Sequence, residues 1–165
     1  TAAFAIRAAT SHKLVLAVLD ATSSVRGVER IIGAFDDDDN RKMLPIFANS
    51  LRLVLHQTLV NRSDGRGVIP AFEILVNNDQ VHNEIQNGKV DKLAWIMQEQ
   101  NMQTLGRSLG KLVASGLVTE EEALRYVSNP NELQYDKEAL EASAYTDNAT
   151  PVVEDNTDTP LMSWL

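Results

Sequence analysis

The chain has 165 residues, 44% of them hydrophobic, which suits one domain with a buried core rather than a disordered polypeptide. It has no cysteine, which excludes disulfides and thiolate metal sites, and no apolar run approaches the ~18 residues that a membrane helix needs. The net charge of −8 belongs mostly to residues 130–165, which hold eight acids and one base. The other 15 acids and 14 bases leave a nearly neutral body that argues against nucleic acid as a partner.

The first 35 residues predict a helix, a strand and a second helix. The Ala-rich stretch 1–10 favours a helix, so the chain begins inside an element and a longer parent is expected. Residues 13–20 contain an unbroken apolar run, which is typical of a buried strand in a parallel sheet. Thr22 or Ser23 can cap the helix expected over 24–35.

The middle of the chain predicts a long helix followed by a β-hairpin. Residues 36–39 suit a turn and helix start, and 40–55 suit a helix with Pro45 best placed in its first turn. Two strands are expected over 57–61 and 68–76. The Asp64-Gly65 pair between them is a strong hairpin signal.

The rest of the chain predicts short helices and then a polar tail. Helices are expected over 79–87, 90–100, 105–115 and 119–127, the last with a capping box of Thr119 and Glu122. A marginal helix is expected over 135–144. Residues 145–159 are polar, acidic and interrupted by proline, so we expect disorder there and docking or fraying of the apolar end 161–165.

Several short motifs occur in an order that resembles the motor domain of the PilT/PilU twitching-motility ATPases of type IV pilus machines. The resemblance covers roughly residues 1–130. The motifs are Ala-Thr-Ser-His (9–12), Glu-Arg-Ile-Ile (29–32), Ala-Asn-Ser-Leu (48–51), Leu-Val (59–60), Asp-Gly-Arg-Gly (64–67), Ala-Phe-Glu-Ile-Leu (71–75) and Met-Gln-Thr (102–104).

This resemblance implies an α/β fold taken from the second half of a RecA-like domain. Residues 1–76 would be a partial parallel sheet layer with its β-hairpin, and 77–129 a C-terminal helical subdomain. Residues 130–165 would be an acidic, flexible tail. The family assembles six-membered rings that couple ATP hydrolysis to pilus retraction or assembly, so ATP and Mg²⁺ are the implied cofactors.

The resemblance also points to residues near the γ-phosphate, although the phosphate loop itself is missing. The pattern G-x-x-x-x-G-K-[ST] is absent, so the chain alone is not expected to bind ATP tightly. His12, Asp20, Thr22 and Ser23 match the two family segments near that phosphate. Asp20 replaces a histidine, and its carboxylate would repel a triphosphate unless a metal intervened. Asp20 could equally be a metal ligand, a general base or an ordinary polar strand end.

A second departure lies on the helix that the family ties to retraction. Where the family has Ala-Ile-Arg-Asn-Leu-Ile-Arg-Glu, this chain has His82 and Gln86 in place of the two arginines. His82 could pair with Glu84 or a neighbouring subunit, or simply be an exposed histidine. The residues proposed for partner contacts are His82, Asn83, Glu84, Gln86, Lys89 and Trp164.

Two hypotheses follow from these patterns. In the first, the chain is part of a hexameric motor ATPase and is catalytic only with the upstream half. In the second, it belongs to a non-catalytic paralogue, a pseudoenzyme that acts as a scaffold or assembly protein. Both imply a cytoplasmic location, with peripheral association at the inner membrane. Related ATPase subunits and a pilus or secretion platform protein are the expected partners. The three histidines lack ligand spacing, so no metal site is expected.

Overall fold

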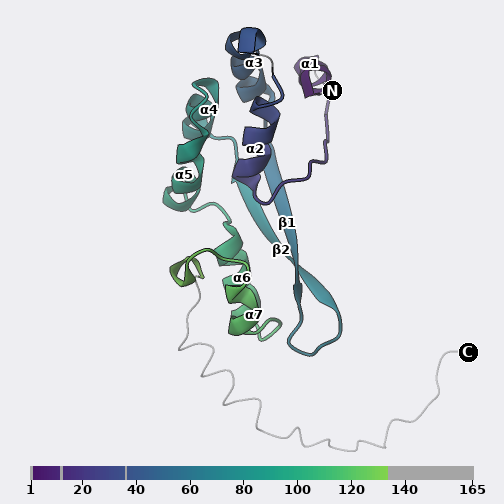
Figure 1. The fold of residues 1–165 in the computed structure, drawn as a ribbon, viewed down its shortest axis with the longest axis vertical. Helices are drawn as coiled ribbons and strands as arrows, with labels where there is room; N and C mark the ends of the chain where they lie inside the picture. The colour runs from purple at the N-terminus through teal and green to yellow at the C-terminus, as the bar shows by residue number, and fades with distance from the viewer. Residues whose placement is uncertain (1, 12, 36, 134–165) are drawn as a thin grey trace, which may run out of the picture. The chain divides into compact units, whose positions relative to one another are not determined.

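A twisted antiparallel pair of strands runs through the described part of the chain, with helices packed along it (Figure 1). The computed structural model describes residues 2–11, 13–35 and 37–133, without the side chains of 37–41. The α-helices are α1 (Ala2–Thr10), α2 (Ser24–Ile32), α3 (Asp37–Ser50), α4 (Asp79–Gln86), α5 (Leu93–Glu99), α6 (Leu105–Ala114) and α7 (Glu120–Leu124). The strands are β1 (Leu53–Asn61) and β2 (Val68–Val76), and two 3₁₀ turns are η1 (Val90–Lys92) and η2 (Pro130–Glu132).

The hairpin between β1 and β2 is confirmed. The strands pair in antiparallel register from Leu53 opposite Val76 to Asn61 opposite Val68. The connecting turn places Gly65 at φ 68°, a left-handed conformation that glycine adopts without steric cost. A 2.8 Å contact between Arg62 and Asp64 braces the turn and, with the Arg66 N–H, lowers the pKa of the Asp64 carboxyl to about 2.

The main core lies where α2, α3, α4 and α5 meet the end of β2. These helices gather round one end of the strand pair, whereas α6 and α7 lie nearer the hairpin turn (Figure 1). Each contributes its apolar stripe, as amphipathic helices do. The fully buried members of this cluster are Val28, Ala48, Leu75, Val81, Ile85 and Leu93.

The predicted strand over residues 13–20 is wrong for this structure. The segment belongs to no sheet, and Leu14, Leu16 and Val18 expose 87%, 88% and 101% of their surface. The sheet of the described residues is antiparallel and two-stranded, so the expected parallel layer is absent there. A fully apolar strand needs neighbours on both edges and cover on both faces, and this segment has neither.

The boundary between α3 and β1 also differs from the prediction. Helix α3 begins at Asp37 and ends at Ser50, so Pro45 lies well inside it rather than in its first turn. Residues 53–55 belong to β1 instead of the predicted helix, and β1 begins four residues earlier than the predicted strand over 57–61. Their alternating exposure, with Leu53 and Leu55 outward and Val54 inward, is a period of two, and pairing with β2 decides the conformation.

The later helices are confirmed in position, with shorter bounds. The helix predicted over 90–100 is divided into η1 and α5, and α7 ends at Leu124. The capping box is only half formed. Thr119 accepts the Glu122 N–H at 3.2 Å, but the Glu122 carboxylate turns away to Asn61. The Glu122 carboxylate therefore accepts hydrogen bonds from Asn61 at the end of β1 instead of from the Thr119 N–H.

The tail beyond residue 133 lies outside the described residues. The expected helix over 135–144, the disorder expected over 145–159 and the apolar end 161–165 all fall beyond residue 133. The predicted division of the body at residue 76 stays a prediction. None of the helices in the described ranges is long and apolar enough to cross a membrane.

Candidate functional site

The N-terminus of α2 is the best-organised polar feature of the chain. Ser23 caps the helix, because its hydroxyl accepts the Arg26 N–H at 3.1 Å. Ser24 is fully buried, and its N–H and hydroxyl both donate to one carboxylate oxygen of Glu73, at 2.7 and 2.5 Å. Glu73 on β2 therefore fixes the start of α2 against the sheet, at the point where segment 13–20 ends.

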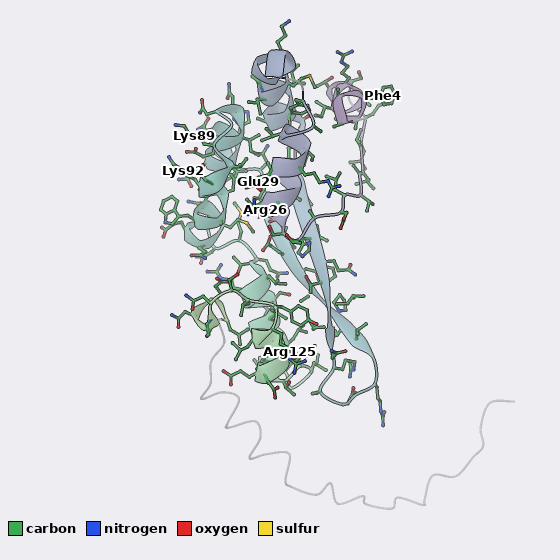
Figure 2. The ribbon with its side chains drawn as sticks, viewed as in Figure 1. Phe4, Arg26, Glu29, Lys89, Lys92 and Arg125 are labelled. Atoms are coloured by element: carbon green, nitrogen blue, oxygen red, sulfur yellow. The ribbon has the colours of Figure 1, made fainter. Side chains whose placement is uncertain are left out.

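Beside this helix start lies a small open pocket of about 220 Å³. Its lining residues are Asp20, Ala21, Thr22, Arg26 and Arg30. The Arg30 guanidinium donates to the Asp20 carbonyl oxygen at 2.6 Å and lies 3.9 Å from its carboxylate. Arg26 pairs with Glu29 at 2.6 Å, and both side chains project from the same side of α2 (Figure 2).

The pocket is suited to attract an anion, but the Asp20 carboxylate opposes it. Arg26 from the first turn and Arg30 from the last turn of α2 both line the pocket, and guanidinium groups favour phosphate-like anions. The pocket is smaller than the roughly 300–1,000 Å³ of small-molecule sites. The residues present therefore do not fit a whole nucleotide and Mg²⁺ without further chain.

The structure brings some of the predicted nucleotide-site residues together and separates others. Asp20 and Thr22 share the small pocket, whereas Ser23 is used as a helix cap. His12 lies outside the described residues. Sequence reasoning missed Arg26 and Arg30, although their spacing of four residues after a helix cap was a usable signal.

A larger cleft of about 570 Å³ lies on the other side of the α2 N-terminus. It is bordered by α2, α5, the start of α6 and the segment 126–132. Its charged lining residues are Arg26, Glu29, Glu73, Asp91 and Glu132, so carboxylates predominate. These carboxylates would repel a phosphate group, so we do not expect the cleft to bind one.

The residues predicted for partner contacts lie mostly on α4 and just after it. Of the alternatives considered for His82, the pair with Glu84 is not formed. His82 lies 3.0 Å from the Asn49 side-chain oxygen on α3, and Glu84 lies 3.7 Å from Lys92. Asn83, Gln86 and Lys89 are exposed, and Figure 2 shows Lys89 and Lys92 along the same edge. Trp164 lies outside the described residues.

Glu122 is a buried polar group that the sequence did not single out for this role. Its carboxylate accepts the Asn61 N–H and side-chain amide, at 3.2 and 2.6 Å, and the Tyr126 hydroxyl at 3.2 Å. The Asn61 N–H contributes most to lowering the pKa of Glu122, with desolvation acting in the opposite direction. The arrangement fastens α7 to the end of β1.

The chain is similar to known proteins over most of its length. It is 30% identical to a twitching motility protein of Neisseria gonorrhoeae over 138 residues, 82% of this chain and 37% of that protein. It is 33% identical to the type IV pilus ATPase PilU of Pseudomonas aeruginosa over 77% of this chain and 34% of that protein. The chain matches no protein-family model.

A solved structure of the pilus retraction motor PilT with bound ADP has the same fold. It superposes with a TM-score of 0.69 at 28% identity, over 79% of this chain and 37% of that one. The chain therefore spans little more than a third of the relatives it matches. It belongs to the family of PilT/PilU-like ATPases and corresponds to the C-terminal part of their motor domain.

Proposed function

We propose that this chain is the C-terminal part of a motor ATPase subunit that powers pilus retraction or secretion. The single observation that carries the proposal is the collinear match to PilU and to the twitching motility protein over about four fifths of the chain. The solved PilT structure contains ADP. For this chain, nucleotide binding would require a phosphate loop from the part of the motor that the chain does not span.

Within the motor, the small pocket at the α2 N-terminus would face the terminal phosphate. Thr22, Arg26 and Arg30 supply a hydroxyl and two guanidinium groups there. These groups can hold phosphate oxygens by charge-assisted hydrogen bonds. The subunits would form a six-membered ring in the cytoplasm, at the inner face of a membrane platform, with α4 available for contacts between proteins.

A second candidate, a non-catalytic subunit, is favoured by one specific observation. The Asp20 side chain is fully exposed at the pocket, where the family's pattern has a histidine. Its negative charge would weaken the hold on a triphosphate. In that case the protein would keep the packing surfaces of the motor and act as a scaffold or assembly component beside active subunits.

Magnesium-dependent ATP turnover by the complete gene product, combined with sedimentation, separates the two candidates. Saturable turnover by a six-membered assembly is expected for the motor. A folded protein that assembles without turnover contradicts the motor and supports the scaffold. An Asp20→His variant provides the matched comparison, because recovery of turnover in that variant alone would assign the loss to this carboxylate.

A further inference from the structure

The turn that leads into α2 is held at both ends by hydrogen bonds. At its start, the Arg30 guanidinium donates to the Asp20 carbonyl oxygen at 2.6 Å. At its end, the Ser24 N–H and hydroxyl donate to one carboxylate oxygen of Glu73, at 2.7 and 2.5 Å. Thr22 lies between these two fixed points and lines the small pocket, whereas Glu73 does not border that pocket. The shape of this pocket wall therefore depends on a residue of β2 that lies outside the pocket.

Glu73 belongs to a strand that is hydrogen-bonded along both edges. One edge of β2 pairs with β1 in antiparallel register. On the other edge, the Phe72 N–H donates to the Ser108 hydroxyl at 2.9 Å, and the Ile74 N–H donates to the Gln103 carbonyl oxygen at 2.8 Å. These two bonds flank Glu73 in the sequence. Groups carried by such bonded elements are placed more precisely than groups on loops, so β2 is a suitable support for the start of α2.

The Glu73 carboxylate is better explained by positioning than by stability alone. Taking a carboxylate out of water costs free energy that a neutral side chain at this position would avoid. An oxygen that accepts both donors of the buried Ser24 fixes where that residue lies and how it is rotated. Ser24 is the first residue of α2, and Arg26 in the same turn lines the pocket. The placement of Arg26 therefore follows that of Ser24.

We propose that Glu73 is a positioning residue of the small pocket. Through Ser24 it fixes the turn 20–23, so that the Thr22 hydroxyl and the Arg26 guanidinium meet a phosphate group in a constant geometry. Glu73 itself does not touch the phosphate. This inference rests on the proposed function, in which the pocket faces the terminal phosphate. Displacing a reacting or binding group by about 1 Å can cost on the order of 100-fold in rate, so a remote support of this kind has a measurable effect.

Hydrogen exchange in the complete gene product tests whether Glu73 fixes the turn. Glu73→Ala should make the amides of Ser24 and Arg26 exchange at least about tenfold faster, because one loses its acceptor and the other depends on the helix cap beside it. The amide of Val81, at the capped start of α4, should be unchanged and serves as the internal control. Equal exchange at Arg26 in the two proteins would overturn the proposal.

Magnesium-dependent ATP turnover tests whether the fixed turn matters to the pocket. Glu73→Ala should lower kcat at least about tenfold and change KM by less than about threefold, with each variant measured below its unfolding midpoint. Glu73→Gln keeps an oxygen that can accept both Ser24 donors and should restore most of kcat. Glu99→Ala removes an exposed carboxylate on α5 and is the matched control. Unchanged turnover in Glu73→Ala, or no recovery in Glu73→Gln, would overturn the proposal.

A double-mutant cycle tests the route through Ser24. Ser24→Ala should lower kcat in the same direction as Glu73→Ala, and the double variant should show no further loss, because the two residues act through one contact. A merely stabilising contact would couple the unfolding free energies of the variants and leave kcat uncoupled. Additive losses in kcat would therefore overturn this route.

The outcome for Glu73 is separable from the outcome for the motor. Turnover that Glu73→Ala leaves unchanged would support the motor and overturn the positioning role. If the unsubstituted complete gene product shows no turnover, the motor is contradicted, and a titration with inorganic pyrophosphate then decides on Glu73. At least about tenfold weaker binding in Glu73→Ala, restored in Glu73→Gln, would support the positioning role. Unchanged binding, or no binding by the unsubstituted protein, would overturn it.

Discussion

At the scale of single residues, Glu122 should make the stability of the body depend on acidity. Its pKa is lowered from the ordinary value of 4.5 in the folded state. The stabilisation is therefore present above pH 4.5 and is lost as the pH falls through the lower folded pKa. Glu122→Gln should flatten the dependence of the unfolding free energy on pH in this range, measured by urea unfolding. Glu121→Gln, with an 86% exposed side chain, should keep the original slope.

Two glycines in helices should respond to alanine with opposite signs. A Cβ on Gly106 would lie 2.0 Å from the Glu132 carbonyl oxygen, so η2 must move, and overpacking of this kind costs about 1–3 kcal/mol. A Cβ on Gly27 would meet Val54 at 3.6 Å and Ala21 at 3.9 Å, both ordinary contacts, so Gly27→Ala should stabilise by about 0.5–1 kcal/mol. Thermal unfolding of the two variants checks both signs. A neutral Gly106→Ala would show that η2 does not rest on α6.

At the scale of elements, the attachment of α2 to β2 depends on one buried serine. Ser24→Ala removes the hydroxyl that donates to Glu73. The backbone N–H of residue 24 still donates to the same carboxylate oxygen. Loss of one bond in a buried pair should lower the unfolding free energy by about 1–3 kcal/mol. Ser128→Ala, at an exposed position, is the matched control. Equal stability of the two variants would contradict the role of Ser24.

Some elements could be predicted from the sequence and others could not. Caps and turns were predictable because their signals are local: Ser23 caps α2, Asn78 caps α4, and Asp64-Gly65 forms the hairpin turn. The conformation of segment 13–20 was not predictable, because an apolar run indicates burial but does not indicate which neighbouring element would bury it. The pocket arginines were missed for a related reason, since Arg26 and Arg30 approach Asp20 only after the chain turns into α2.

At the scale of the whole molecule, the described residues form a helical body around one antiparallel strand pair. Its core closes round α2 to α5 and the end of β2, while Leu14, Leu16 and Val18 of segment 13–20 stay exposed. The relatives share this body as roughly a third of their length. In the proposed motor, nucleotide binding would therefore need groups from outside this third, above all a phosphate loop.

Equilibrium titration with Mg²⁺ and ATP, of the isolated chain and of the complete gene product in parallel, tests that account most directly. We expect saturable binding by the complete gene product and none by the isolated chain. Saturable binding by the isolated chain would contradict it, because 165 residues without a phosphate loop would then be sufficient for the site.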